Sequence, residues 1–283
     1  MKKIRETLMH IVFMLTACIS IAAVVLICVF LLGNGVPAIA KVGVFKFLFG
    51  MRWRPENDIY GIFPMIVGSL YVTAGALVIG VPIGVLTAVF MAEFCPKRLY
   101  SVLKPAFNLM AGIPSVVYGF FGLVVLVPFV RNYIGGRGLS VLTASVLLGL
   151  MILPTIISVS EAAIRAVPRS YYEGGLALGA SHERSVFRAA VPAAKSGIFA
   201  GIILGVGRAI GETMAVMMVA GNQAVIPDSL TAGVRTLTTN IVLEMGYATD
   251  LHREVLIATA VVLFVFILII NLSFSLVKRK GAK

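Results

Sequence analysis

Six long runs of apolar residues constrain this chain more than any other feature of its sequence. They cover residues 10–33, 62–93, 114–130, 141–160, 197–220 and 255–277. A hydrocarbon core of ~30 Å takes roughly 20 apolar helical residues to cross, and most of these runs come close to or exceed that length. Lipid offers no partner to backbone N–H and C=O groups, so each run should be a helix. The sequence predicts an all-α integral membrane protein with six transmembrane helices.

The composition agrees with a membrane location. Of the 283 residues, 59% are hydrophobic and 13% charged. The net charge of +12 could indicate nucleic-acid binding in a soluble protein. Here the basic residues gather at the ends of the apolar runs, as topology signals do, so we expect no nucleic-acid partner. The first run exceeds the ~7–15 apolar residues of a signal peptide, and we interpret it as an uncleaved helix.

The distribution of Lys and Arg predicts the orientation. If the N-terminus is inside, the inner segments carry 15 basic residues and the outer segments 8. This excess predicts a multi-pass protein of the cell (plasma or inner) membrane with both termini in the cytoplasm. The inner set is Lys2, Lys3, Arg5, Lys97, Arg98, Lys104, Arg165, Arg169, Arg184, Arg188, Lys195, Lys278, Arg279, Lys280 and Lys283, and the outer set is Lys41, Lys46, Arg52, Arg54, Arg131, Arg137, Arg235 and Arg253. In the first outer loop, Trp53 suits the membrane interface.

A charged, glycine-containing segment at about 168–192 lies between two apolar runs and should face the cytoplasm. Pro168 suits the first turn of a helix, and Gly179 can take the left-handed conformation that ends one. Ser181 can cap a second helix, "HERSVFRAAV". The pattern predicts two short helices joined by a tight turn. An ordinary amphipathic connector would show the same pattern.

The spacing within this segment distinguishes it from a plain connector. The segment contains Glu173 followed by two small residues, then Gly179 and then Val191-Pro192. This order resembles the Glu-Ala-Ala signature of the permeases of ATP-binding-cassette importers. Gly174 and Gly175 stand where that signature has alanines. A literal Glu-Ala-Ala begins at Glu161, but no turn glycine follows it at the required distance, so we assign the signature to Glu173.

Other stretches narrow the resemblance. "AGIPSVVYGFFG" from Ala111 and "GRAIGETMAVMMVAGN" from Gly207 are similar to the permeases of phosphate-specific importers. The "GETMAV" ending, "WRP" from Trp53 and "YGIFPMIVGSL" from Tyr60 resemble the C-type subunit more than the A-type subunit. The resemblance runs from about residue 50 to the last apolar run.

This resemblance implies a type I ABC importer permease bundle with cytoplasmic coupling helices that dock into an ATPase subunit. The implied contact residues are Glu173, Leu178, Gly179, Ala180 and Ser181. The implied partners are an A-type permease in a heterodimer, two ATPase subunits and an extracytoplasmic phosphate-binding protein. This chain would carry no cofactor, because the partner subunits bind the ATP. Residues 1–60 would form an N-terminal helix and outer loop, and 61–283 the permease domain.

Two charges lie inside the fifth apolar run. At 100° per residue, Arg208 and Glu212 fall within roughly 40° of a line that also includes Gly197, Gly201, Gly205 and Ala215. Four residues apart, the two charges could pair with one another. Intramembrane charges are costly and usually functional, and a guanidinium suits phosphate. We expect both in the substrate path, with a purely structural pair as the alternative.

In the outer loop after the fifth apolar run, we expect Asn222, Asp228 and Arg235 to face the binding protein.

Several chemistries have no motif in this sequence. It contains no GxxxxGK[ST] loop, no HExxH and no GxSxG, so the chain should not be an ATPase itself. The three histidines, His10, His182 and His252, lie far apart, and we assign no metal site and no catalytic residue. Two alternatives stay open. One is a permease for another oxyanion, namely molybdate, tungstate or sulfate. The other is an intramembrane enzyme that uses Arg208 and Glu212.

Overall fold

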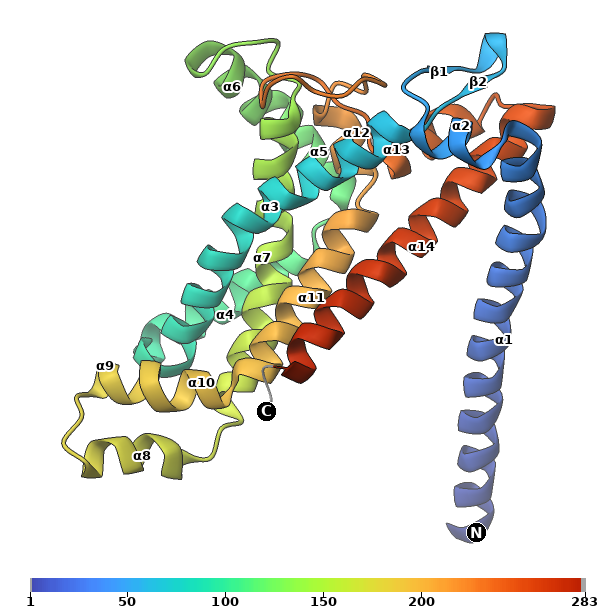
Figure 1. Ribbon diagram of the computed structural model, residues 1–283. Coiled ribbons are helices and arrows are strands. Elements are labelled where there is room, and N and C mark those ends of the chain that lie inside the picture. Colours follow the sequence, from blue (N-terminus) through green and yellow to red (C-terminus); the bar gives the residue numbers. More distant parts are fainter. Residues whose placement is uncertain (1, 281–283) are drawn as a thin grey trace.

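The computed structural model describes residues 2–280, which form an almost entirely helical bundle (Figure 1). Lys283 of the charge count lies outside the described residues. The start of α1 and the end of α14 lie at the same end of the bundle as α8 and α9 (Figure 1). The elements are α1 Lys2–Val42, α2 Val44–Phe49, β1 Trp53–Arg54, β2 Ile59–Tyr60, α3 Phe63–Val89, α4 Lys97–Gly112, α5 Ser115–Phe121, α6 Val127–Tyr133, α7 Val141–Arg165, α8 Arg169–Ala177, α9 His182–Ser185, α10 Val191–Ala193, α11 Lys195–Gly211, α12 Met214–Val219, α13 Leu237–Met245 and α14 Asp250–Lys280.

Within the described residues, five helical segments are long and apolar enough to cross a membrane, and a sixth is a bent pair. The five segments and the bent pair overlap the six predicted runs, so six spans are confirmed if the bent pair counts as one. The bent pair is His182–Ala193 with Lys195–Gly211, at an angle of 69°. The predicted continuous span 197–220 is wrong, because the helix ends at Gly211 and α12 starts only at Met214.

Helix α7 lies at the centre of the bundle between α3 and α11, and it is the most deeply buried of the spans. Glycines allow this close packing from both sides. A Cβ added at Gly84 of α3 or at Gly205 of α11 would come within 2.9 Å of the Ile156 side chain of α7. Small residues at four-residue spacing thus form a packing face on each of these helices.

A second core lies at the end of the molecule where α1, α2 and the β1–β2 hairpin meet α13 and α14. Phe47, Trp53 and Tyr60 are buried there against Leu237 and Leu256. Helix α1 packs against α14 near this end, where Gly35 lets the backbone of Ala258 approach, and then diverges from the bundle (Figure 1). The proposed domain boundary at residue 60 stays a prediction, since residues on both sides of it share this core.

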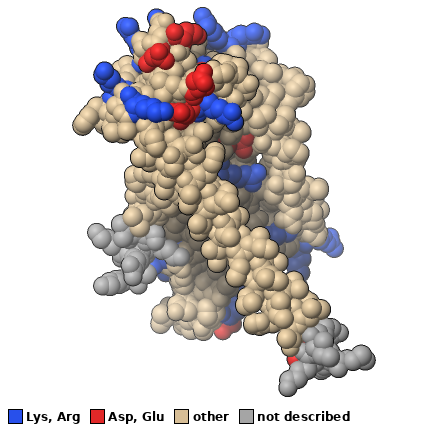
Figure 2. Space-filling view, turned by 90° about the vertical axis from the view of Figure 1, so that its right-hand side faces the viewer, with Lys and Arg blue, Asp and Glu red and all other residues tan. Residues whose placement is uncertain are grey.

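The surface charges are distributed as a membrane protein requires. Figure 2 shows Lys, Arg, Asp and Glu crowded at the end that carries the hairpin, above a long shaft in which nearly all visible residues are uncharged. An uncharged shaft of exposed Leu, Ile, Val and Phe side chains is the surface that lipid tails solvate. The chain is therefore built as a multi-pass membrane protein.

Candidate functional site

The predicted turn between two short helices is present and projects from one end of the bundle (Figure 1). Helix α8 ends in a Schellman arrangement, in which the N–H of Gly179 donates to Leu176 O at 2.9 Å and that of Ala180 to Gly175 O at 3.1 Å. Gly179 has a φ of +79°, a conformation that favours glycine. The Ser181 hydroxyl accepts the N–H of Arg184 at 3.3 Å and caps α9, as predicted.

The two helices of this turn are tied to one another and to the bundle. The Ser185 hydroxyl donates to Tyr172 O at 2.6 Å, and the Tyr172 hydroxyl lies 2.9 Å from His182 Nδ1. The π-helical turn after α9, Val186–Ala190, places Val186 fully inside a core formed with Ile164 of α7 and Ala88 of α3. Packed side chains thus connect the turn directly to α3 and α7.

The tip of the turn is open to a partner. Leu178 is 90% exposed, and a side chain at Gly174 or Gly179 would meet nothing within 4 Å. Glu173 is also exposed, whereas Glu161 of the literal Glu-Ala-Ala is buried in α7. This difference in exposure agrees with placing the signature at Glu173. Contact of Glu173, Leu178, Gly179, Ala180 and Ser181 with an ATPase stays a prediction.

Arg208 and Glu212 do not pair as predicted. Because α11 ends at Gly211, Glu212 lies in extended backbone and no longer follows the helical spacing. Its carboxylate accepts the N–H groups of Thr213 and Ala215, each at 3.2 Å, and so caps α12. Arg208 is half-buried and its Nη1 donates to Thr155 Oγ1 of α7 at 3.3 Å. The two charges lie on either side of a helix break, and their role in a substrate path stays a prediction.

A buried carboxylate that the sequence reasoning did not assign holds the end of the bundle nearest α8. Glu161 Oε2 lies 2.7 Å from Lys104 Nζ of α4, and its Oε1 accepts from Arg165 Nε at 2.9 Å and from Tyr100 Oη at 2.7 Å. Arg165 also donates to Met91 O at 2.7 Å. Glu161, the first residue of the literal Glu-Ala-Ala sequence, therefore joins α4 to α7.

A second unassigned carboxylate, Glu244 of α13, organises the opposite end. It accepts from Trp53 Nε1 at 2.8 Å and Arg235 Nη1 at 2.6 Å, and it lies 2.9 Å from His252 Nε2. Two expectations are corrected here. Trp53 is buried in the protein and not at a lipid interface, and Arg235 is turned inward to Glu244 and to the carbonyl of Asn222.

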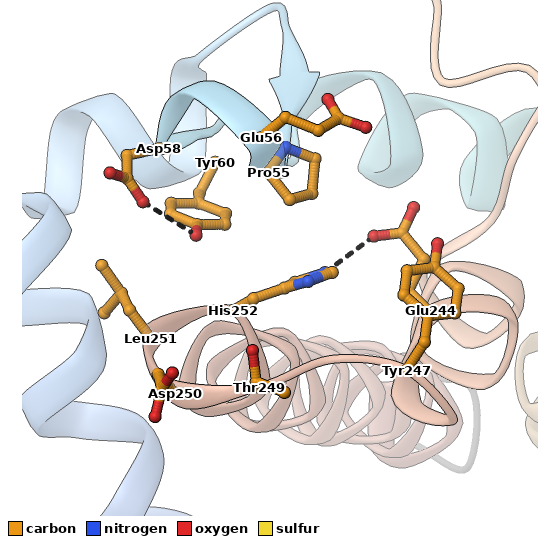
Figure 3. A pocket seen from close by; sticks show the side chains of 10 residues that line it. All are labelled: Pro55, Glu56, Asp58, Tyr60, Glu244, Tyr247, Thr249, Asp250, Leu251 and His252. Carbon is orange, nitrogen blue, oxygen red and sulfur yellow. Dashed lines mark hydrogen bonds and ion pairs between the residues drawn. The ribbon is translucent and has the colours of Figure 1, made fainter.

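Beside Glu244 is a cavity of about 410 Å³ between the hairpin and the start of α14 (Figure 3). His252 lies across it, between the Tyr60 and Tyr247 rings. Burial, together with a hydrogen bond to Asp58, raises the pKa of Tyr60 to about 12. Burial and the nearby Glu244 carboxylate raise the pKa of Tyr247. The side chains of His182 and His252 both have protein partners, Tyr172 and Glu244.

Among the described residues no group of three or more His, Cys, Asp or Glu could hold a metal ion. The carboxylates at 161 and 244 are each occupied by protein donors. What the arrangement offers is a bundle clamped at both ends, a broken helix with a half-buried arginine in its middle, and an exposed turn.

The sequence profile of one family, described as "binding-protein-dependent transport system inner membrane component", matches residues 80–282. That match covers more than half of the chain. The chain therefore belongs to this family of inner membrane permeases.

Individual relatives agree. The chain is 42% identical over 269 residues to a probable ABC transporter permease protein of Bacillus subtilis, YqgH, covering 90% of this chain and 87% of the relative. It is 34% identical over 247 residues to the phosphate transport system permease protein PstC of Mesorhizobium japonicum, covering 80% and 76%. The probable PstC of Methanocaldococcus jannaschii is 32% identical over 271 residues, covering 88% and 85%.

Solved structures support the fold. A chain of a bacterial ABC transporter involved in the import of alginate aligns with a TM-score of 0.64 at 15% identity, covering 95% of this chain and 96% of that one. A chain of the inward-facing MetNI methionine ABC transporter aligns with a TM-score of 0.62 at 20% identity, covering 82% and 100%. The fold is that of ABC importer permeases, as the resemblance implied.

Proposed function

We propose that this chain is the C-type permease subunit of an ATP-driven importer of inorganic phosphate. The observation that carries the proposal is the exposed turn between α8 and α9, which is anchored to the bundle through Val186 but leaves Leu178 uncovered. A permease whose spans must move with an external ATPase needs such an element. Inorganic phosphate is proposed as the substrate because the relatives named above include phosphate permeases.

The orientation follows from the same element. We place the turn, the start of α1 and the end of α14 in the cytoplasm, where ATP is available. The excess of Lys and Arg at this side supports the assignment. The hairpin, α13 and the loop at 220–236 then face outward, toward a phosphate-binding protein. An A-type permease and two ATPase subunits would complete the assembly, and the ATPase subunits would bind all of the ATP.

Arg208 is the residue we propose for transient phosphate binding. It lies one turn before the break at Gly211, in a span where an unneutralised charge is costly, and its guanidinium retains donors beyond the one given to Thr155. Broken helices expose backbone groups at the depth where transporters bind their substrates. We propose that Glu212, just past the break, keeps the anion from being held too tightly.

The substrate is tested by reconstituting the complete assembly in vesicles and measuring ATP-dependent uptake. We expect uptake of phosphate and little uptake of sulfate or molybdate. Preferential transport of sulfate, molybdate or tungstate would assign the chain to another oxyanion importer. Activity of the isolated chain without ATP would point instead to an intramembrane enzyme.

The substrate path is tested with Arg208→Gln in that assembly, with Arg131→Gln at the exposed end of α6 as a matched loss of charge. We expect phosphate uptake to be lost in the first variant and retained in the second. Unchanged uptake by Arg208→Gln, with normal assembly, would remove Arg208 from the path.

Docking is tested with Gly179→Trp. The left-handed φ of Gly179 strains any other residue locally, but the open space around it accommodates a large side chain in the free chain and not under a closely packed partner. We expect normal membrane insertion and no co-purification of the ATPase. If the ATPase still co-purifies with this variant, the turn is not the docking element.

A further inference from the structure

A cavity of about 640 Å³ opens where the end of α1, helix α2, the hairpin and the start of α14 meet. It is separate from the cavity of Figure 3, although Asp58, Tyr60 and Leu251 contribute to both. None of the residues considered for transport or docking lines it. The lining consists of Lys41, Val42, Lys46, Gly50, Met51, Arg52, Asp58, Ile59, Tyr60, Gly61 and Leu251.

The charge of this cavity is positive and only partly neutralised. Lys41 is paired with Glu254 at 2.6 Å, and Asp58 accepts the Tyr60 hydroxyl at 3.2 Å. Lys46 and Arg52 are exposed, and neither forms an ion pair with any described acidic residue. Two cations beside one cavity are therefore available to an anion from outside the chain.

Exposed apolar side chains of α2 and the hairpin adjoin the residues that line the cavity. In α2, Phe47 points into the core while Phe45, 80% exposed, and Phe49 face outward. Met51 and Ile59 on the hairpin side are exposed as well. A short helix with one anchored aromatic ring and two exposed ones fits the boundary between lipid tails and headgroups. Helix α2 lies beside the β1–β2 hairpin (Figure 1), and the hairpin end is the charged end of Figure 2.

We propose that this cavity binds the headgroup of an anionic phospholipid in the leaflet at the hairpin end. Lys46 and Arg52 hold the phosphate group, and the Phe45 and Phe49 rings lie along the acyl chains. A ligand that is charged at one end and oily at the other matches both halves of the site. A free phosphate ion would use the cations but leave the exposed apolar side chains uncovered.

The chain carries its own reporter, because Trp53 is its single tryptophan. Its ring lies 5.7 Å from that of Tyr60, which lines the cavity. The full-length chain is placed in nanodiscs of phosphatidylcholine, with rising fractions of phosphatidylglycerol brominated near the glycerol. Brominated phosphatidylcholine serves as the zwitterionic counterpart. We expect the anionic lipid to quench Trp53 at a much lower fraction than the zwitterionic lipid.

The variant Lys46→Gln/Arg52→Gln should lower this preference by roughly 30-fold, because each basic side chain near an anionic lipid surface contributes on the order of a fivefold gain. The control Lys97→Gln/Arg98→Gln removes two exposed charges at the start of α4 and should leave the preference unchanged. Both variants change exposed side chains, and elution by size-exclusion chromatography checks their folding.

Three results would overturn the proposal. The first is equal quenching by the two brominated lipids in the parent chain, and the second is an unchanged preference in the Lys46/Arg52 variant. The third is displacement of the anionic lipid by millimolar inorganic phosphate but not by chloride of equal ionic strength, which would make the occupant a free anion. No effect of phosphate, together with the loss of preference in the variant, supports the lipid site.

Discussion

The Glu244 centre and the α8–α9 turn lie at opposite ends of the molecule and are built in opposite ways. Around Glu244, donors from the hairpin, the loop before α13 and the start of α14 converge on one buried carboxylate. At the turn, Leu178 and the two glycines at 174 and 179 face open space. At one end protein donors surround the buried Glu244 carboxylate, and at the other the apolar Leu178 side chain is exposed.

This difference suggests that the Glu244 centre contributes mainly to stability and the α8–α9 turn mainly to assembly with a partner. A change at the Glu244 centre should unfold or loosen the permease before it alters transport, whereas a change at the turn should alter assembly before stability. The stability of each variant is measured as the apparent free energy of unfolding of the purified chain in mild detergent.

The largest effect is expected for Glu244→Leu. The substitution removes the acceptor of Arg235, Trp53 and His252 and leaves a largely buried guanidinium without its anion. Breaking a buried ion pair in this way costs roughly 3–5 kcal/mol. Thermal unfolding monitored by Trp53 fluorescence should show a lowered midpoint. Glu244→Gln keeps an oxygen acceptor and should lose less, and equal midpoints for the leucine variant and the parent would contradict the clamp.

A smaller effect is expected where α8 meets α9. A Cβ at Gly175 would collide with the Ser185 hydroxyl, so Gly175→Ala forces the helices apart at a cost of about 1–3 kcal/mol. Gly174→Ala is the matched control, since its Cβ meets open space, and it should stabilise the helix by roughly 0.5–1 kcal/mol. Opposite shifts of the two melting curves are the expected outcome. Similar shifts would mean that the helices are not in close contact.

An intermediate case is Tyr60, whose hydroxyl donates to Asp58. Tyr60→Phe should cost about 0.5–1.5 kcal/mol at neutral pH. Because the pKa of Tyr60 is raised to about 12, the phenol stabilises the fold fully below its ordinary pKa near 10 and loses this contribution as the pH rises toward 12. The parent-minus-variant tyrosinate absorbance should titrate near pH 12, and a midpoint near 10 would contradict the buried, bonded phenol.

The smallest effect on stability is expected for Leu178→Asp. The side chain is almost fully exposed, so its loss should change the free energy of unfolding by less than about 0.5 kcal/mol. Co-purification of the ATPase subunits should nevertheless be lost, because a carboxylate would be buried in the docked interface. A destabilised Leu178→Asp chain would show that the turn belongs to the folded core after all.

The sequence predicts well what depends on neighbouring residues. Apolar length indicates the spans, and the order Pro168, Gly179, Ser181 indicates helix, turn and cap. All three are local effects of backbone conformation and of the solvent. The break in the fifth span had a local signal too, Gly211 followed by a polar pair, but the apolar residues on either side of it suggested one continuous helix.

Contacts between distant residues could not be predicted in the same way. Trp53 and Glu244 are 191 residues apart, and nothing near either residue indicates the other. Trp53 alone fits a lipid interface, and Arg235 alone fits an exposed loop. Only the arrangement of four elements in space turns both side chains inward. For the same reason Glu161 is identified as a clamp only once α4 lies beside it.

The docking of α1 against α14 has a consequence for how the chain is made. Gly35 packs on Ala258, and Lys41 pairs with Glu254, so the main partner of this helix is synthesised more than 200 residues later. During translation α1 is made before α14, so the two helices can pack together only after the central helices have been made. Contacts between segments this far apart in the sequence form slowly. Closure of the α1–α14 pair is therefore expected to be a late step of biogenesis, and a stalled chain that ends before residue 250 should hold its first helix without its partner.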